Sequence, residues 1–181
     1  DLHSFPTRRS SDLHIADPSH VIVDWVANCA VEAAVAHESI FADHGKDYGP
    51  VLASVIENGH AIAGTDYQRI LLRRMAFRGR LNALFSNIDL LLTPVQPFPP
   101  LTLSTIRTLG EQPDLVSKLQ RYTCPFDMSG HPTITLPAGA SNAGMPIGVQ
   151  LVAASLREEL LVRAGAAFQR ATDWHRRRPV A

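Results

Sequence analysis

Ser129 and His131 bring a hydroxyl nucleophile and an imidazole base within two residues of each other. Such a pair carries acyl transfer when the imidazole accepts the hydroxyl proton. The Gly-x-Ser-x-Gly turn that exposes the nucleophile of α/β-hydrolases is absent from the chain. Because neighbours in sequence rarely reach the geometry that proton transfer needs, we do not expect these two residues to act together, and we assign no catalytic residue.

Residue types that bind metals or cofactors are scattered along the chain. His37 and His44 are seven residues apart, but no cysteine or carboxylate completes a zinc site with them. Asp89 and Asp127 are single carboxylates, and spacing alone does not make them an acid–base pair. The chain has no HExxH motif, no Walker loop and no Gly-x-Gly-x-x-Gly. The sequence therefore predicts neither a metal site nor a cofactor.

Composition narrows the class of protein. The chain has 181 residues, of which 45% are hydrophobic, as in an ordinary globular domain. Lys+Arg and Asp+Glu both number 17, so the basic excess of a nucleic-acid binder is missing. No apolar run approaches the roughly 18 residues that a membrane span requires. Cys29 and Cys124 are far apart and favour two buried thiols. We expect a cytoplasmic protein with no nucleic-acid or membrane partner.

The elements that must position any site follow from hydrophobic periodicity. The pattern predicts helices over 21–41, 50–58 and 65–86, a strand over 88–93, a short helix over 111–121, strands over 133–136 and 147–152, and a last helix over 155–174. Five arginines make the helix over 65–86 basic, and we interpret them as a solvated face. The order indicates an α/β fold, with one edge of a sheet layered by helices.

Local signals predict where these elements begin and end. Gly59 is placed as a C-terminal helix cap. Thr65 with Gln68, and Ser155 with Glu158, have the spacing of a capping box at a helix start. Pro132 and Pro137 are expected to flank the strand between them.

The first thirteen residues, 1–13, form a polar stretch without apolar periodicity. They match, at every position, the translated end of a common short-read sequencing adapter. Residues of this origin do not belong to a natural fold. We therefore interpret 1–13 as an artefact and expect 14–181 to be the C-terminal portion of a single domain; a disordered tail is the other interpretation of 1–13.

Five segments of the chain follow one another in a recognisable order. They are Y-G-P at 48–50, F-S-N-I-D-L-L-L-T-P at 85–94, C-P-F-D-M-S-G-H-P-T-I-T-L-P-A-G at 124–139, G-M-P-I-G-V-Q-L-V at 144–152 and W-H-R-R-R-P at 174–179. Together they resemble the middle and late motifs of the amidase signature family, over about Val21 to Pro179. One position departs from the pattern, because Asp127 stands where the family usually has Asn. A buried aspartate there would need hydrogen-bond donors around it.

The resemblance implies a fold and an activity. The fold would be the C-terminal part of an α/β/α sandwich, a mixed sheet covered by helices and incomplete here. The activity would be hydrolysis of a small-molecule carboxylic amide to acid and ammonia or amine by a Ser–cis-Ser–Lys triad, without a cofactor. The family's triad lies in a Gly/Ser-rich N-terminal stretch that this chain lacks, and Lys46 and Lys118 are its only lysines. The fragment alone is therefore expected to be inactive. For the full-length enzyme, a homodimer is compatible with the resemblance.

Two other functions compete with a general amidase. The first is the glutamine-hydrolysing subunit of a glutamine-dependent aminoacyl-tRNA amidotransferase, which the chain resembles less well. That branch tends to have arginine in the helix after Y-G-P and aspartate shortly before the P-x-N segment, and neither is found here. The second is a complete non-catalytic binding module, which requires the adapter match of 1–13 to be a coincidence.

The substrate pocket of the full-length enzyme is expected where the strand over 88–93 ends, because ligands of α/β sheets collect beyond the carboxyl ends of strands. Thr93, Pro94 and Val95 lie at that end. Phe126 is the largest apolar residue of the segment 124–129, which we expect to run directly into the next strand. We predict that these four residues line the acyl pocket, with a plain core position as the other interpretation of Phe126.

Overall fold

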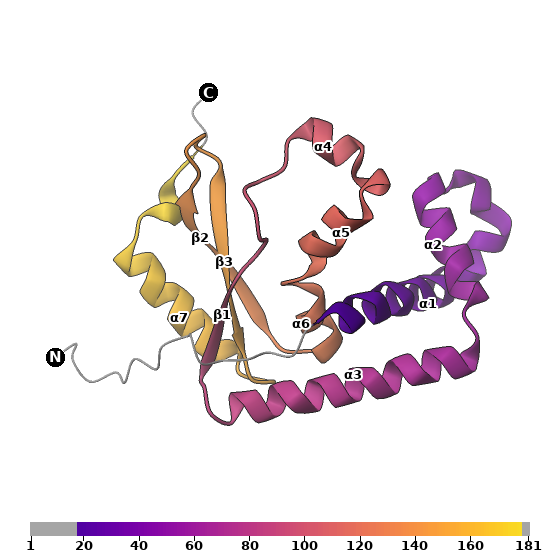
Figure 1. Cartoon of the computed structure of the whole chain (residues 1–181), viewed down its shortest axis with the longest axis horizontal. Helices are drawn as coiled ribbons and strands as arrows, with labels where there is room; N and C mark the ends of the chain where they lie inside the picture. Colours follow the sequence, from indigo (N-terminus) through magenta and orange to yellow (C-terminus); the bar gives the residue numbers. More distant parts are fainter. Residues whose placement is uncertain (1–17, 179–181) are drawn as a thin grey trace.

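The computed structural model describes residues 18–178 and begins with three helices. They are α1 (Ser19–His44), α2 (Pro50–Ala61) and α3 (Gly64–Phe85), and one 3-10 turn, Gly45–Asp47, follows α1. α1 and α3 lie side by side, and α2 folds back against α1 (Figure 1). The three helices predicted for this half are confirmed. The interpretation of 1–13 concerns residues outside the described part.

Gly59 is part of a helix crossing and not the helix cap that the sequence suggested. α2 continues to Ala61, and Gly59 is buried against α1. A Cβ atom added to Gly59 would lie 2.5 Å from the carbonyl carbon of Ala30 and 2.9 Å from the Cβ of Ala34, and it would overlap the Ala30 carbonyl oxygen. The glycine is therefore required because the two helix backbones approach too closely for any side chain.

Neither predicted capping box forms. α3 begins at Gly64, so Thr65 already lies inside the first turn, and the cap position is held by Ala63 without a side-chain hydrogen bond. α7 (Glu158–Ala171) begins three residues after Ser155, whose buried hydroxyl has no hydrogen-bond partner within residues 18–178. In both helices acidic residues of the first turn supply the charge that favours a helix N-terminus. α7 also ends earlier than predicted, and a separate 3-10 turn, Trp174–Arg176, follows it.

The described strands form one antiparallel sheet in the order β1-β3-β2. β1 (Leu90–Pro94) and β2 (Thr133–Ala140) both pair with the central strand β3 (Pro146–Ala153), so within residues 18–178 each has one unpaired edge. The prediction that Pro137 ends its strand is wrong, because β2 continues to Ala140. An edge strand tolerates the missing amide, and the register is irregular between Pro137 and Gly139.

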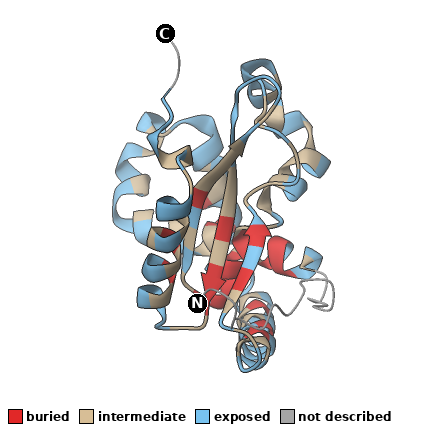
Figure 2. Cartoon of the chain, turned by 90° about the vertical axis from the view of Figure 1, so that its left-hand side faces the viewer, coloured by how far each residue is buried: buried red, intermediate tan, exposed pale blue. Residues whose placement is uncertain are grey.

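Helices cover both faces of this sheet, which confirms the α/β fold. α7 packs on one face, where Gly165 lies against Ile134 and Leu136 of β2 (Figure 1). α1, α3 and the short helix α6 (Cys124–Ser129) pack on the other face. The main core lies between the sheet and these three helices, in the lower part of Figure 2. Its buried members are Val21, Ile70, Phe77, Leu81, Leu91, Phe126, Met128 and Val152.

The connection between β1 and β2 is mostly helical. It contains α4 (Leu103–Arg107), a 3-10 turn (Leu109–Glu111) and α5 (Pro113–Gln120), which confirms the helix predicted over 111–121. The expectation that 124–129 runs directly into a strand is wrong, because these residues form α6. Pro125 suits the first turn of that helix, and Gly130, with φ of 70°, ends it in the left-handed conformation that glycine adopts readily.

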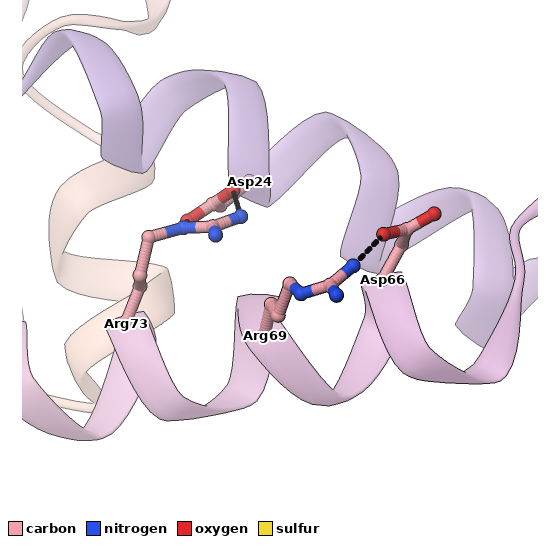
Figure 3. A network of polar contacts seen from close by, with 4 residues as sticks. All are labelled: Asp24, Asp66, Arg69 and Arg73. Atoms are coloured by element: carbon pink, nitrogen blue, oxygen red, sulfur yellow. Dashed lines mark hydrogen bonds and ion pairs between the residues drawn. The ribbon is translucent and has the colours of Figure 1, made fainter.

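α1 and the turn after it, Ser19–Asp47, are long and apolar enough by length and composition to cross a membrane. Yet one side of α1 packs on α2, α3 and α6 and carries two buried polar residues. Asn28 accepts a hydrogen bond from Tyr67, and Asp24 accepts two from Arg73, at 2.6 and 2.7 Å (Figure 3). Such polar pairing with a neighbouring helix is typical of a helix in a protein core.

Candidate functional site

A small hollow lies where β1 ends against the helices. Its volume is about 170 Å³, and its walls come from the start of α1, from α3, from β1 and from the segment that joins α5 to α6. The lining residues are Pro18, Phe77, Leu81, Thr93, Arg121, Tyr122, Pro125 and Phe126. Most of this lining is apolar, with polar groups at Thr93, Arg121 and Tyr122. The hollow suits a compact hydrocarbon group that carries one polar end.

The structure brings two of the four predicted pocket residues together. Thr93 and Phe126 both line the hollow. Pro94 and Val95 do not line it: Pro94 is exposed, and Val95 packs beside Gly148, where an added Cβ would lie 3.1 Å from a Val95 methyl carbon. Alternation along β1 accounts for Pro94, because Thr93 points toward α3 and α6 while Pro94 points to the opposite face, and Val95 lies beyond the end of the strand. Whether Thr93 and Phe126 contact substrate stays a prediction.

Phe77 and Leu81 of α3 were not predicted as pocket residues. They are four residues apart, so they stand one above the other on the buried face of the helix. Their spacing in the sequence marks them as core positions, and nothing in it marks the hollow. Tyr122 and Pro125 were also missed, because their segment was expected to run directly into a strand and not through α6.

Gln150, in the central strand, holds two walls of the hollow. Its side chain is only 3% exposed. The amide nitrogen donates to the main-chain carbonyl of Tyr122 at 2.7 Å and to the hydroxyl oxygen of Thr93 at 3.3 Å. Both hydrogens of the amide are therefore used. Gln150 lies opposite Thr93 in the strand register, which explains why a single side chain reaches both partners.

The side chains of Ser129 and His131 meet, although we did not expect a usable nucleophile–base pair from their sequence spacing. Nδ1 of His131 lies 2.9 Å from the Ser129 hydroxyl, because the chain turns sharply at Gly130 between them. The arrangement still lacks an accessible nucleophile, since Ser129 is 1% exposed and its hydroxyl donates to the carbonyl of Phe126. Nε2 of His131 lies 3.1 Å from the side-chain oxygen of Asn82, so the pair ties the end of α6 to α3.

Burial also shifts the pKa values of three ionisable side chains near this site. Burial lowers the pKa of His131, and the positive charge of Arg78 lowers it further. Burial raises the pKa of the Cys124 thiol to about 11, which keeps it protonated and unreactive. Cys29 and Cys124 are both free thiols; Cys124 is buried as predicted, whereas Cys29 is only half-buried. Asp127 is exposed, so the need for donors that a buried aspartate would have does not arise. Partial desolvation raises the pKa of Asp127, and a hydrogen bond with Trp25 opposes that shift.

Metal-binding groups do not assemble in the described part of the chain. Across residues 18–178 no three histidine, cysteine or acidic side chains are placed to hold one ion.

Comparison with known proteins decides the family. The model of the family described as Amidase matches residues 9–162. The chain belongs to the amidase family. In the sequence of a Mycobacterium tuberculosis protein named "Putative amidase AmiD", 43% of 150 aligned residues are identical, covering 83% of this chain and 32% of that protein. The chain spans about a third of the length of the curated relatives that it matches most fully.

Other relatives cover the same region of the amidase fold. A glutamyl-tRNA(Gln) amidotransferase subunit from Rhodopirellula baltica is 38% identical over 113 residues, or 62% of this chain and 22% of that protein. The solved structure of 6-aminohexanoate cyclic dimer hydrolase superposes with a TM-score of 0.74 and 27% identity, over 88% of this chain and 36% of that one. These comparisons confirm the resemblance that the five sequence segments suggested.

Proposed function

We propose that this amidase segment belongs to a full-length enzyme that hydrolyses carboxylic amides to the acid and ammonia or an amine. The observation that carries the proposal is the 43% identity to a protein named as an amidase over most of the chain. The bond broken is the amide C–N bond; water supplies the hydroxyl of the acid and the hydrogen of the amine. The nucleophile and base of the proposed Ser–cis-Ser–Lys triad belong to a part of the enzyme outside this chain.

The two lysines of the chain support that division. A lysine that acts as a general base must be neutral, which requires burial or a neighbouring positive charge. Lys46 and Lys118 are both exposed. Ser129 is buried and already donates its proton to a carbonyl. The described residues therefore offer substrate-binding walls, and we assign the chemical step to residues elsewhere in the enzyme.

The hollow supports a role in binding the hydrocarbon part of the amide. A dry cavity of about 150 Å³ is large enough for benzene, and this one has about 170 Å³. We propose that Thr93 and Phe126 contact the acyl group. Pro94 and Val95 do not line the hollow, and we assign them no contact with the acyl group.

The test uses the full-length enzyme and a matched pair of variants. We expect turnover of a simple aryl amide that a serine-directed reagent abolishes, and no turnover by the isolated chain 14–181. Phe126→Ala should shift preference toward larger acyl groups, whereas Phe168→Ala, on the far side of the sheet, should not. Unchanged preference in a destabilised Phe126→Ala enzyme would support the plain core position of Phe126.

A second function rests on the similarity to the amidotransferase subunit. That function would make glutamine the amide and would require partner subunits and a charged tRNA. A subunit of this kind from Chloroflexus aggregans matches 82% of this chain at 31% identity, whereas the mycobacterial relative matches 83% at 43%, so the higher identity favours a general amidase. Release of ammonia from glutamine that depends on added partner subunits would favour it. A cytoplasmic location and a homodimer remain predictions alongside either function.

A further inference from the structure

Gln150 places a polar side chain where the surrounding core is apolar. It lies in β3 between Thr93 of β1 and Thr135 of β2, and its neighbour two residues on, Val152, belongs to the hydrophobic core. A polar group so fully buried is stable only when its hydrogen bonds are made. Its two hydrogen bonds go to Thr93 and Tyr122, and both of those residues line the hollow.

The two walls that Gln150 joins have different supports. The wall made by Phe77 and Leu81 belongs to α3 and is fixed by the core. The wall made by Tyr122 belongs to the turn between α5 and α6, and no strand pairing holds that turn. Phe126 follows Tyr122 by four residues, but its ring lies in the core and α6 packs on α1 and α3, so a movement of the turn displaces Tyr122 and leaves Phe126 in place. The hydrogen bond from Gln150 to the Tyr122 carbonyl is thus a direct link between the sheet and the wall that lacks strand pairing.

We propose that Gln150 is a positioning residue that sets the width of the substrate pocket. This inference rests on the proposed amidase function of the hollow. With Gln150 in place the pocket admits amides whose acyl group is a single aromatic ring or a short branched chain. Without these two hydrogen bonds the Tyr122 turn loses its link to β3 and shifts, and small acyl groups lose their close contacts while larger ones gain room.

The experiment compares Gln150→Met and Gln150→Glu in the full-length enzyme. Methionine keeps the length of the side chain and removes both donors. Glutamate at neutral pH places a carboxylate against the Tyr122 carbonyl, whereas a protonated carboxyl group donates to that carbonyl again. The matched controls are Gln169→Met and Gln169→Glu on the exposed face of α7. Thr93→Val, which removes one of the two acceptors, serves if the Gln150 variants fail to fold.

Selectivity is measured as the ratio of kcat/KM for benzamide to kcat/KM for a bicyclic aryl amide, between pH 5 and pH 8. We expect Gln150→Met to lower the ratio about tenfold, mainly through KM for benzamide. Gln150→Glu should show the same loss at pH 8 and recover part of it at pH 5, whereas the Gln169 variants should match the parent enzyme throughout. A ratio that stays constant in Gln150→Met, or a loss in Gln150→Glu without recovery at pH 5, overturns the inference.

Benzamide binding separates this inference from the proposed function. Its dissociation constant, measured by ligand-observed NMR, needs no turnover. Binding to the parent enzyme that weakens about tenfold in Gln150→Met supports the role of Gln150 even if every amide fails as a substrate, a result that would refute only the proposed activity. Equal binding by the parent and by Gln150→Met refutes the role of Gln150 and leaves the activity unaffected.

Discussion

The crossing of α1 and α2 makes one glycine unusually sensitive to a single added methyl group. Replacing Gly59 with alanine places a Cβ 2.5 Å from the carbonyl carbon of Ala30, where ordinary contacts begin at 3.4 Å. The helices must therefore separate by about 1 Å, and overpacking of this kind costs about 1–3 kcal/mol. Contact with rigid backbone places the cost at the upper end of that range. Alanine recovers about 0.5–1 kcal/mol of helix propensity, which leaves a net loss of about 2 kcal/mol.

Gly79 supplies the control, because it is also inside a helix but has nothing within 4 Å of an added Cβ. There the same substitution should stabilise the protein by about 0.5–1 kcal/mol. Urea denaturation of the full-length enzyme, followed by far-UV circular dichroism, measures both variants. With slopes of about 1–3 kcal/mol/M, Gly59→Ala should lower the midpoint by roughly 1 M and Gly79→Ala should raise it slightly. A Gly59→Ala midpoint at or above that of the parent would refute the close approach.

Three further predictions follow from the buried polar groups and the exposed apolar ones. Arg73→Met leaves Asp24 buried without its two donors and should cost about 2 kcal/mol, below the range of about 3–5 kcal/mol for fully buried pairs because Arg73 is half exposed. Arg69→Met, in the exposed pair with Asp66, should cost under about 1 kcal/mol in the same denaturation assay. The pKa of His131 is lowered in the fold, so its contribution to stability is complete above the unfolded pKa of about 6.5 and is lost as the pH falls through the folded pKa. The denaturation midpoint should therefore drop between pH 7 and pH 5. The drop should be smaller in His131→Gln. The isolated chain 14–181 should bind ANS and self-associate, since Val23, Met75 and Leu92 are more than 60% exposed; a monomer with a sharp thermal transition would contradict this.

The order of the elements could be predicted from the sequence because it depends on periodicity, which is local. The long helices and all three strands have clear apolar patterns, and their positions are confirmed to within a few residues. The two capping-box predictions were wrong because helix starts are not decided by local sequence alone. Their spacing is a pattern of only two residues, and the helix start is decided by packing that the pattern does not contain.

The contacts inside the fold could not be predicted, because they join residues far apart in sequence. Five arginines of α3 gave the pattern of a solvated face, yet Arg73 binds Asp24 of α1 and Arg74 donates to the Met128 carbonyl of α6. Gly59 likewise looks like a helix cap until the path of α1 is known. For the candidate site, Thr93 and Phe126 could be predicted from the rule that ligands collect at strand ends. Gln150 could be recognised in the sequence only as part of a motif, without its contacts.

Within residues 18–178 one edge of β1 has no paired strand, so the association of the chain depends on which strand reaches that edge first. Backbone groups along such an edge accept any strand of suitable register, and Leu92 adds an exposed apolar side chain next to it. The curated relatives are about three times as long as the region that they share with this chain, and any strand that their additional residues supply to this edge is tethered to it. A short tether holds its segment at an effective concentration in the millimolar range, far above that of a second molecule in a dilute solution. Covalent attachment therefore favours pairing of the β1 edge with a strand of the same polypeptide over pairing with a second molecule. When the tether is cut, that advantage is lost and other copies of the chain can pair with the edge.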